Sequence, residues 1–197
     1  VDELLGYCVK ISGQPWPEVE RKILESHKID IIVRYAKKFK PKGWPEAEPK
    51  ILREGGVGDI VGYVKKCKPQ GWPEAEPKIL REGGVGDIID YVKKCKPQGW
   101  PEAERKIAED SYWSYIYARD ILKCKRFRKG ESAIAQSAEW SYWYTKCVLK
   151  GERFRKGEPA IAQDARWSYV YARDGLGCKR FPEGEPAIAQ SAEWSYR

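Results

Sequence analysis

The sequence lacks several features that catalytic and membrane proteins rely on. Its 197 residues include no methionine and one histidine, His27, so a Ser-His-Asp or Cys-His arrangement has a single candidate base. No aliphatic run exceeds three residues (31–33 is one), far short of the roughly 18 apolar residues of a membrane span. No basic segment followed by an apolar one opens the chain, so we expect no signal peptide, and localisation stays open. The missing initiator methionine predicts a native N-terminus that is absent or processed.

Charge is abundant but mixed in sign. Charged residues make up 34% of the chain, the formal net charge is +8 and the mean hydropathy is -0.69. Lys and Arg alternate with Asp and Glu without a long run of one sign, which is typical of a solvated surface. This charge permits an acidic protein or a nucleic acid as partner without requiring either.

An internal repeat of 27–28 residues dominates the sequence. The segment GWPEAEPKILREGGVGDI begins at Gly43 and again at Gly71. The WPE motif also recurs at Trp16 and Trp100, and a second tryptophan series has a period of 27 (Trp113, Trp140, Trp167 and Trp194). We therefore predict one continuous array over 1–197, with WPE-type repeats of 28 residues in 1–98 and a shift to WSY-type repeats of 27 residues in 99–197.

Each repeat is expected to contain two helices. Pro45 and Pro49 are tolerated only before or within a first helical turn, so a short first helix begins near Glu48. We expect Gly55 and Gly56 to end it in left-handed C-cap geometry. A second helix over 58–67 then carries an apolar stripe at i, i+4, i+7 spacing (Ile60, Val64 and Cys67).

The later repeats use other signals for the same shape. The segment FRKGEPAIAQ predicts a short first helix, and four residues are expected to be N-caps of second helices (Asp110, Ser137, Asp164 and Ser191). Helices this short are marginal alone, so stacking must bury their stripes. We predict an all-α solenoid of about seven stacked helix-turn-helix repeats. Its predicted core contains Trp16, Trp44, Trp72, Trp100, Trp113, Trp140 and Trp167.

Both ends of the chain resemble half-repeats. Residues 1–14 parallel the second half of a repeat, and residues 181–197 parallel the first half. Two explanations remain: the chain is part of a longer array, or one molecule completes the next. The second explanation predicts head-to-tail association into a ring or filament.

The phrases WPEAE and GEPAIAQDARWSYVYARD resemble tandem repeats of uncharacterised phage and giant-virus proteins, over almost the whole chain. That resemblance implies architecture and no activity. More loosely, the design is similar to the tetratricopeptide family of α-solenoids, whose repeats are longer, at about 34 residues, and whose signature is not met here.

Several residues of the types found in catalytic, metal and phosphate sites have structural explanations as well as functional ones. The cysteines form no C-x-x-C pair and Cys67 aligns with Phe39, so we expect small core residues rather than zinc ligands or disulfides. His27 is expected in the loop between two helices. The paired acids (Glu46/Glu48, Glu74/Glu76 and Glu102/Glu104) recur at helix starts, where the helix dipole favours them, and the GGVG segments lack the lysine of a phosphate-binding loop.

Two surfaces are candidates for binding. Basic residues recur after the second helices and would align as a stripe able to follow a phosphate backbone (Lys37, Lys38, Lys65, Lys66, Lys93, Lys94, Lys125, Arg128 and Arg155). The alternative is that these residues compensate helix C-termini and form salt bridges to glutamates of the next repeat's first helix. Tyr115, Tyr142 and Tyr169 lie off the tryptophan face, so they are candidates for an exposed ladder that stacks bases.

These features favour a non-enzymatic scaffold, a structural or protein-interaction protein that binds a protein partner or itself. The alternative is sequence-tolerant nucleic-acid binding through the basic stripe. We expect no catalytic residues, cofactor, metal site or membrane association.

Overall fold

The computed structural model describes Gly6 and residues 14–196. The chain forms two compact units, Val1–Lys96 and Pro97–Arg197, called the N-terminal and C-terminal units here. Short helices follow one another in both, and no strand occurs among the described residues, so the predicted all-α helical-repeat fold is confirmed. The division lies close to residue 98, where the repeat type changes. One continuous array over 1–197 stays a prediction.

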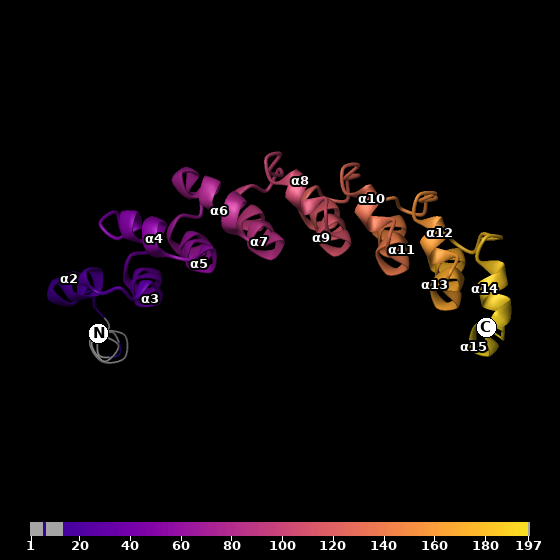
Figure 1. The fold of residues 1–197 in the computed structure, drawn as a ribbon, viewed down its shortest axis with the longest axis horizontal. Coiled ribbons are helices and arrows are strands. Elements are labelled where there is room, and N and C mark those ends of the chain that lie inside the picture. Colours follow the sequence, from indigo (N-terminus) through magenta and orange to yellow (C-terminus); the bar gives the residue numbers. More distant parts are fainter. Residues whose placement is uncertain (1–5, 7–13, 197) are drawn as a thin grey trace. The chain divides into compact units, whose positions relative to one another are not determined.

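Each repeat has a first helix, the A helix, and a second helix, the B helix. B helices of the N-terminal unit pack on one another, and each A helix packs on the B helices beside it (Figure 1). The A helices are α2 (Pro17–Glu25), α4 (Glu48–Glu54) and α6 (Glu76–Glu82), the last preceded by the 3-10 turn η2 (Pro73–Ala75). The B helices are α3 (Ile29–Phe39), α5 (Val57–Cys67) and α7 (Val85–Cys95).

Local sequence explains where these helices begin. Helix α4 starts at Glu48, so Pro49 lies in the first turn, where the missing N–H is not needed. At the start of α5 the Asp59 carboxylate accepts a hydrogen bond from the Gly56 N–H at 3.2 Å. The predicted stripe of α5 is confirmed, because Ile60, Val64 and Cys67 are all buried.

The predicted left-handed cap at Gly55 is wrong. Its φ of -73° and ψ of 144° are extended backbone, and Gly56, with φ of -70°, is the N-cap of α5. Glycine is needed here for space: a Cβ on Gly55 would meet the carbonyl oxygen of Ile51 and lie 3.1 Å from a side-chain carbon of Ile29. The residue thus allows one repeat to pack closely on the preceding one.

The C-terminal unit repeats the A and B helices in shortened form. Its B helices also pack on one another, and α9 and α13 each continue into a π-helical turn. The A helices are α8 (Glu104–Ile107), α10 (Glu131–Ile134), α12 (Glu158–Ile161) and α14 (Glu185–Gln190). The B helices with their π turns are α9 (Ser111–Ile116), η3 (Tyr117–Ile121), α11 (Ala138–Cys147), α13 (Ala165–Val170), η4 (Tyr171–Gly175) and α15 (Ala192–Ser195).

The predicted N-caps of these B helices are confirmed. Asp110 accepts a hydrogen bond from the Trp113 N–H at 2.8 Å, and Asp164 accepts one from the Trp167 N–H at 2.9 Å. Ser137 and Ser191 make the same contact to the following tryptophan. After the B helices, positive φ angles mark tight left-handed turns, at Lys123, Cys124, Lys150, Gly151, Gly177 and Cys178.

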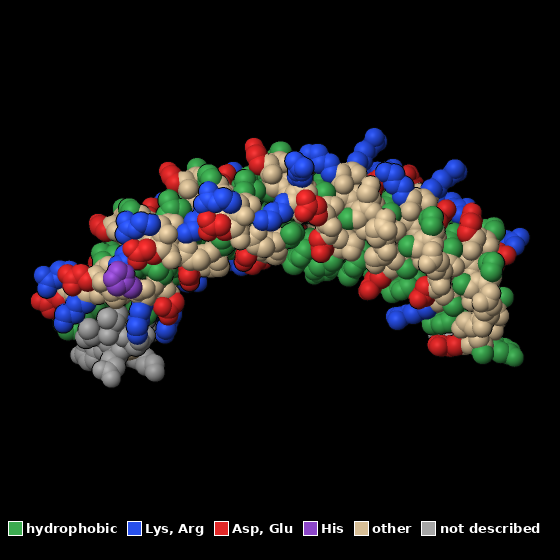
Figure 2. Space-filling model, viewed as in Figure 1, with side chains coloured by type: hydrophobic (Ala, Val, Ile, Leu, Met, Phe, Trp, Pro, Cys, Tyr) green, Lys and Arg blue, Asp and Glu red, His purple; other side chains and the backbone are tan. Residues whose placement is uncertain are grey.

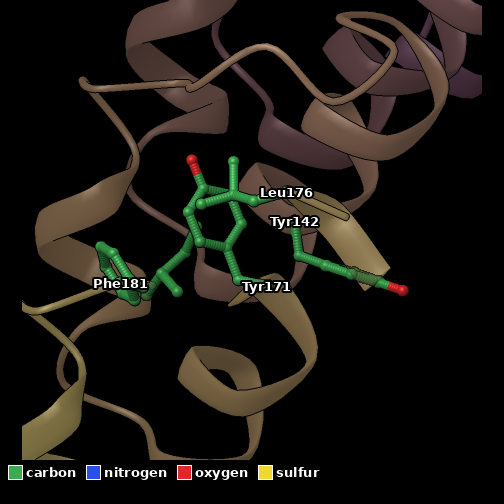
Figure 3. Close-up of a cluster of buried hydrophobic side chains, with 5 residues drawn as sticks. Tyr142, Tyr171, Leu176 and Phe181 are labelled. Atoms are coloured by element: carbon green, nitrogen blue, oxygen red, sulfur yellow. The ribbon is translucent and has the colours of Figure 1, made fainter. Parts of the chain in front are cut away.

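Aromatic and aliphatic side chains from consecutive repeats form the core. In the C-terminal unit, Tyr142 of one B helix lies in a buried cluster with Tyr171 and Leu176 of the next repeat, and Phe181 packs on Tyr171 (Figure 3). Trp44, Trp72 and Trp100 are buried at the starts of their repeats, and Trp113, Trp140 and Trp167 are half-buried. Trp16 is 38% exposed, so its prediction as a core residue is wrong; it precedes α2, the first A helix that the structure describes.

Candidate interaction surfaces

A hydrogen-bonded group joins the two helices of each repeat. In the second WPE repeat, the buried Tyr63 hydroxyl of α5 accepts a hydrogen bond from the Trp44 N–H at 2.6 Å. The same hydroxyl donates to Oε1 of Glu48 in α4 at 2.9 Å. Lys68, which follows α5, places its Nζ 2.9 Å from Oε2 of Glu48. We call this set the Tyr–Glu cluster; it ties the B helix to the start of its A helix.

The Tyr–Glu cluster recurs in both units. Its basic member is lysine in the N-terminal unit, whereas arginine takes that place where Arg126 binds Glu131 and Arg153 binds Glu158. The tyrosine hydroxyls donate to glutamate in every case, at Tyr35, Tyr63, Tyr91, Tyr117, Tyr144 and Tyr171. Burial and the nearby glutamate raise the pKa of Tyr171 to about 12, so this hydroxyl stays a neutral donor at physiological pH.

The glutamates of this cluster correct the interpretation of the paired acids. Glu48 does lie in the first turn of α4, but its carboxylate is largely occupied by Tyr63 and Lys68. Sequence reasoning missed this group. A usable signal existed, because the tyrosine, the glutamate and the lysine share one period of 28 residues.

Other lysines connect consecutive repeats. Lys78 of α6 donates to the carbonyl oxygens of Leu52 at 2.9 Å and Gly55 at 2.8 Å, at the C-terminal end of α4. Lys50 makes the same kind of bond to the carbonyl of Leu24, at 2.8 Å. A cation at a helix C-terminus is favoured by the helix dipole, so these bonds stabilise the stacking of A helices.

The residues of the predicted basic stripe are all exposed. Six lie in the last turns of α3, α5 and α7, at equivalent positions of consecutive B helices of the N-terminal unit, and three lie in loops of the C-terminal unit. Lys65 is partly neutralised by Asp90 of the next repeat, at 2.6 Å. Figure 2 shows Lys and Arg side chains beside Asp and Glu on the face in view of each unit. The stripe as a binding surface stays a prediction.

The predicted exposed tyrosine ladder is wrong. Tyr115 and Tyr142 are 2% and 4% exposed, and Tyr169 is half-buried. Each lies off the tryptophan face of its own helix but packs on the tryptophan of the next repeat: ring centroids are 5.6 Å apart for Tyr115 and Trp140. The aromatic series is therefore a contact between repeats and not a free stacking surface.

The cysteines and the histidine have structural surroundings. Burial raises the pKa of the Cys67 thiol to about 11, as expected for a small core residue, whereas Cys178 is exposed, contrary to that expectation. Cys8 lies outside the described residues.

His27 is confirmed in the loop between α2 and α3, with Nδ1 3.6 Å from Glu54. Among the described residues, no disulfide and no group of potential metal ligands occurs.

An open, largely apolar groove of about 370 Å³ lies between the B-helix segment α13–η4 and α14. Tyr169 and Ile188 line it and are half-buried. Their equivalents one repeat earlier, Tyr142 of α11 and Ile161 of α12, are buried in a cluster with the B-helix segment of the repeat that begins with α12. The groove therefore has the chemistry of a contact surface between repeats. Its other lining residues are Ala172, Arg173, Cys178, Lys179, Arg180, Phe181 and Glu185.

Comparison with known proteins gives no relative from which a function can be transferred. No protein-family model matches the chain, and no curated protein or solved structure is significantly similar to it. Within the described part of the chain, no helix combines the length and apolar character that crossing a bilayer requires.

Proposed function

We propose that this chain is a non-enzymatic scaffold that binds protein by continuing its own stack of repeats, with a second copy of the chain as the occupant. The groove beside α14 carries the proposal. Its side chains are the repeat equivalents of residues that are otherwise buried between repeats.

The contacts one repeat earlier indicate how the groove would be filled. Tyr142 of α11 and Ile161 of α12 pack in one cluster with Tyr171 and Leu176, which follow α12 in its own repeat. Tyr171 and Leu176 lie five positions apart. Tyr117 and Leu122 have the same spacing, as do Tyr144 and Leu149. A repeat of a second molecule thus has the residues that this groove would accept, and such head-to-tail contacts generate rings or filaments.

The use of the titratable side chains supports a scaffold over an enzyme. Glu48 and Glu76, the residues that resemble paired catalytic acids, are bound to the Tyr63 and Tyr91 hydroxyls and to lysines. Their geometry serves the joint between two helices, and the same joint recurs from repeat to repeat. A structural contact that recurs from repeat to repeat is typical of a scaffold, which functions through its shape.

Sedimentation velocity over a range of concentrations tests the proposal. The wild-type chain is expected to gain mass as concentration rises, whereas Ile188→Lys places a charge in the groove and should keep the chain monomeric. Ala189→Lys, at the adjacent exposed position of α14, is the matched control and should associate like the wild type. A wild-type chain that stays monomeric at every concentration, or equal effects of the two variants, would refute self-association through this groove.

A further inference from the structure

Two adjoining hollows in the C-terminal unit each have three or more cations among their lining residues. One has a volume of about 460 Å³ and the other about 370 Å³, and both lie where the loop after α11 meets the loop after η4. They share four lining residues, Lys150, Gly151, Leu176 and Lys179. Lys150 and Lys179 therefore border both hollows, from two different repeats.

The cations around these hollows differ in how far they are neutralised. Arg153 binds Glu158 at 2.6 Å and Glu183 at 3.1 Å, and Arg180 binds Glu185 at 2.7 Å. The acid Asp174 is held by Arg173 at 2.6 Å. The arginine charges and the Asp174 charge are thus largely balanced. Glu152 also lines the larger hollow and offsets one lysine, so the remaining positive charge rests on the other lysines.

The preceding junction between loops of the C-terminal unit lacks this pair of lysines. Lys179 occupies the position that Glu152 holds one repeat earlier, and Lys150 occupies the position of Lys123. The equivalent pair one repeat earlier is therefore Lys123 with Glu152, in which the two charges oppose each other. Within the C-terminal unit, the junction between the loops at 148–157 and 176–184 therefore places two lysines in this register, and the junction before it does not.

The backbone of both loops forms tight, hydrogen-bonded turns beside the hollows. Lys150 and Gly151 have φ angles of 52° and 88°, and Gly177 and Cys178 have 67° and 61°. The turns are fixed by hydrogen bonds from the Gly151 N–H to the Thr145 carbonyl at 3.0 Å and from the Cys178 N–H to the Arg173 carbonyl at 2.9 Å. Lys150 therefore extends from an ordered turn and not from a loose segment.

We propose that these hollows bind phosphate groups, held between Lys150 and Lys179 with Lys146 as a third cation. Lys146 lines the second hollow and lies over the Tyr142 and Trp143 rings, which keeps its ammonium at this edge. The phosphate can belong to a nucleic-acid strand or to a free phosphate compound. The site is separate from the basic stripe, which includes Arg128 and Arg155 but none of these lysines.

Fluorescence anisotropy with a labelled single-stranded oligonucleotide, and calorimetry with pyrophosphate, distinguish the two sources. At low salt we expect the oligonucleotide to bind, with an affinity that falls with salt at a log–log slope of roughly -2 for three lysines. Replacing Lys150 and Lys179 by glutamate should weaken binding by about 10-fold or more. Arg166→Glu, at an exposed site in α13 that lies outside both hollows and outside the basic stripe, is the control with the same charge change per residue.

The two binding measurements on the variant with Lys150 and Lys179 replaced distinguish the two sources of phosphate. Loss of oligonucleotide binding alone assigns the site to a strand, and loss of pyrophosphate binding as well assigns it to a free phosphate compound. Absence of binding to both probes, or an equal loss in Arg166→Glu, overturns the proposal. Sedimentation of the Ile188→Lys chain is an independent measurement, so the failure of one proposal leaves the other intact.

Discussion

Removing one hydroxyl from the Tyr–Glu cluster should destabilise the fold measurably. In Tyr63→Phe the ring stays, but the buried Trp44 N–H loses its acceptor and Glu48 loses a donor. A buried group without a partner costs about 1–3 kcal/mol, and Lys68 still binds Glu48, so we expect a loss of about 2 kcal/mol in unfolding free energy. For a chain of this size that corresponds to roughly 4–8 °C in Tm.

Urea denaturation followed by tryptophan fluorescence measures this loss, and hydrogen exchange localises it to α4 and α5. Tyr144→Phe should cost more, because the Glu131 side chain is 4% exposed and the Glu48 side chain 17%. Tyr112→Phe, on a ring that is 38% exposed, is the control and should change stability little. A cost below about 0.5 kcal/mol for Tyr63→Phe, or one equal to that of Tyr112→Phe, would refute the structural role of the cluster.

Three further predictions follow from backbone geometry and ionisation. Cys124→Gly relieves a φ of 60° and should stabilise the chain by about 0.5–1 kcal/mol. Gly151→Ala, at the equivalent turn, should destabilise it. Thermal unfolding checks this, because the Tm should rise in the first variant and fall in the second. Gly55→Ala should lower the free energy of unfolding by roughly 1–3 kcal/mol, because the new Cβ overlaps Ile51. Gly58→Ala has open space around its Cβ and should not lower it. Similar urea midpoints for the two variants would contradict the close-packing argument. Because the pKa of Tyr171 is about 12 when folded and about 10 when unfolded, its contribution should be intact below pH ~10 and lost as pH rises towards ~12; urea midpoints that do not fall across this range would contradict it.

The period of the sequence predicted the elements well, because short helices carry local signals. Pro49 could only lie in a first turn, and Asp110 and Asp164 precede their helices as caps do. These features depend on a few neighbouring residues. The residues within one or two helical turns are therefore enough to predict where these helices begin.

The features that were missed depend on distance in space. Gly55 was interpreted as a cap because its packing against Ile29 of the preceding repeat leaves no mark in the local sequence. Tyr115 lies off the tryptophan face of its own helix, but stacking turns that side towards Trp140. Periodicity defines the face of a helix, whereas the neighbour that covers it depends on the angle between repeats.

The candidate sites were predicted less completely than the fold. The basic stripe was found by counting lysines, but Lys65 is paired with Asp90, which counting does not reveal. Lys150 and Lys179 come from different repeats at non-equivalent positions, so a comparison of equivalent positions does not bring them together. A site that combines two different repeat positions is recognised only once neighbouring loops are placed in space.

The members of a Tyr–Glu cluster come from a single repeat, and this affects how such a chain can change length in evolution. Trp44, Glu48, Tyr63 and Lys68 all fall within one 28-residue period, so excising residues 44–71 removes a whole cluster and cuts none. The segment 72–99 differs from it only at Val61/Ile89 and Gly62/Asp90, so the new neighbours would meet nearly identical side chains. Unequal recombination could therefore lengthen or shorten the gene by one period at a time and still encode a folded product.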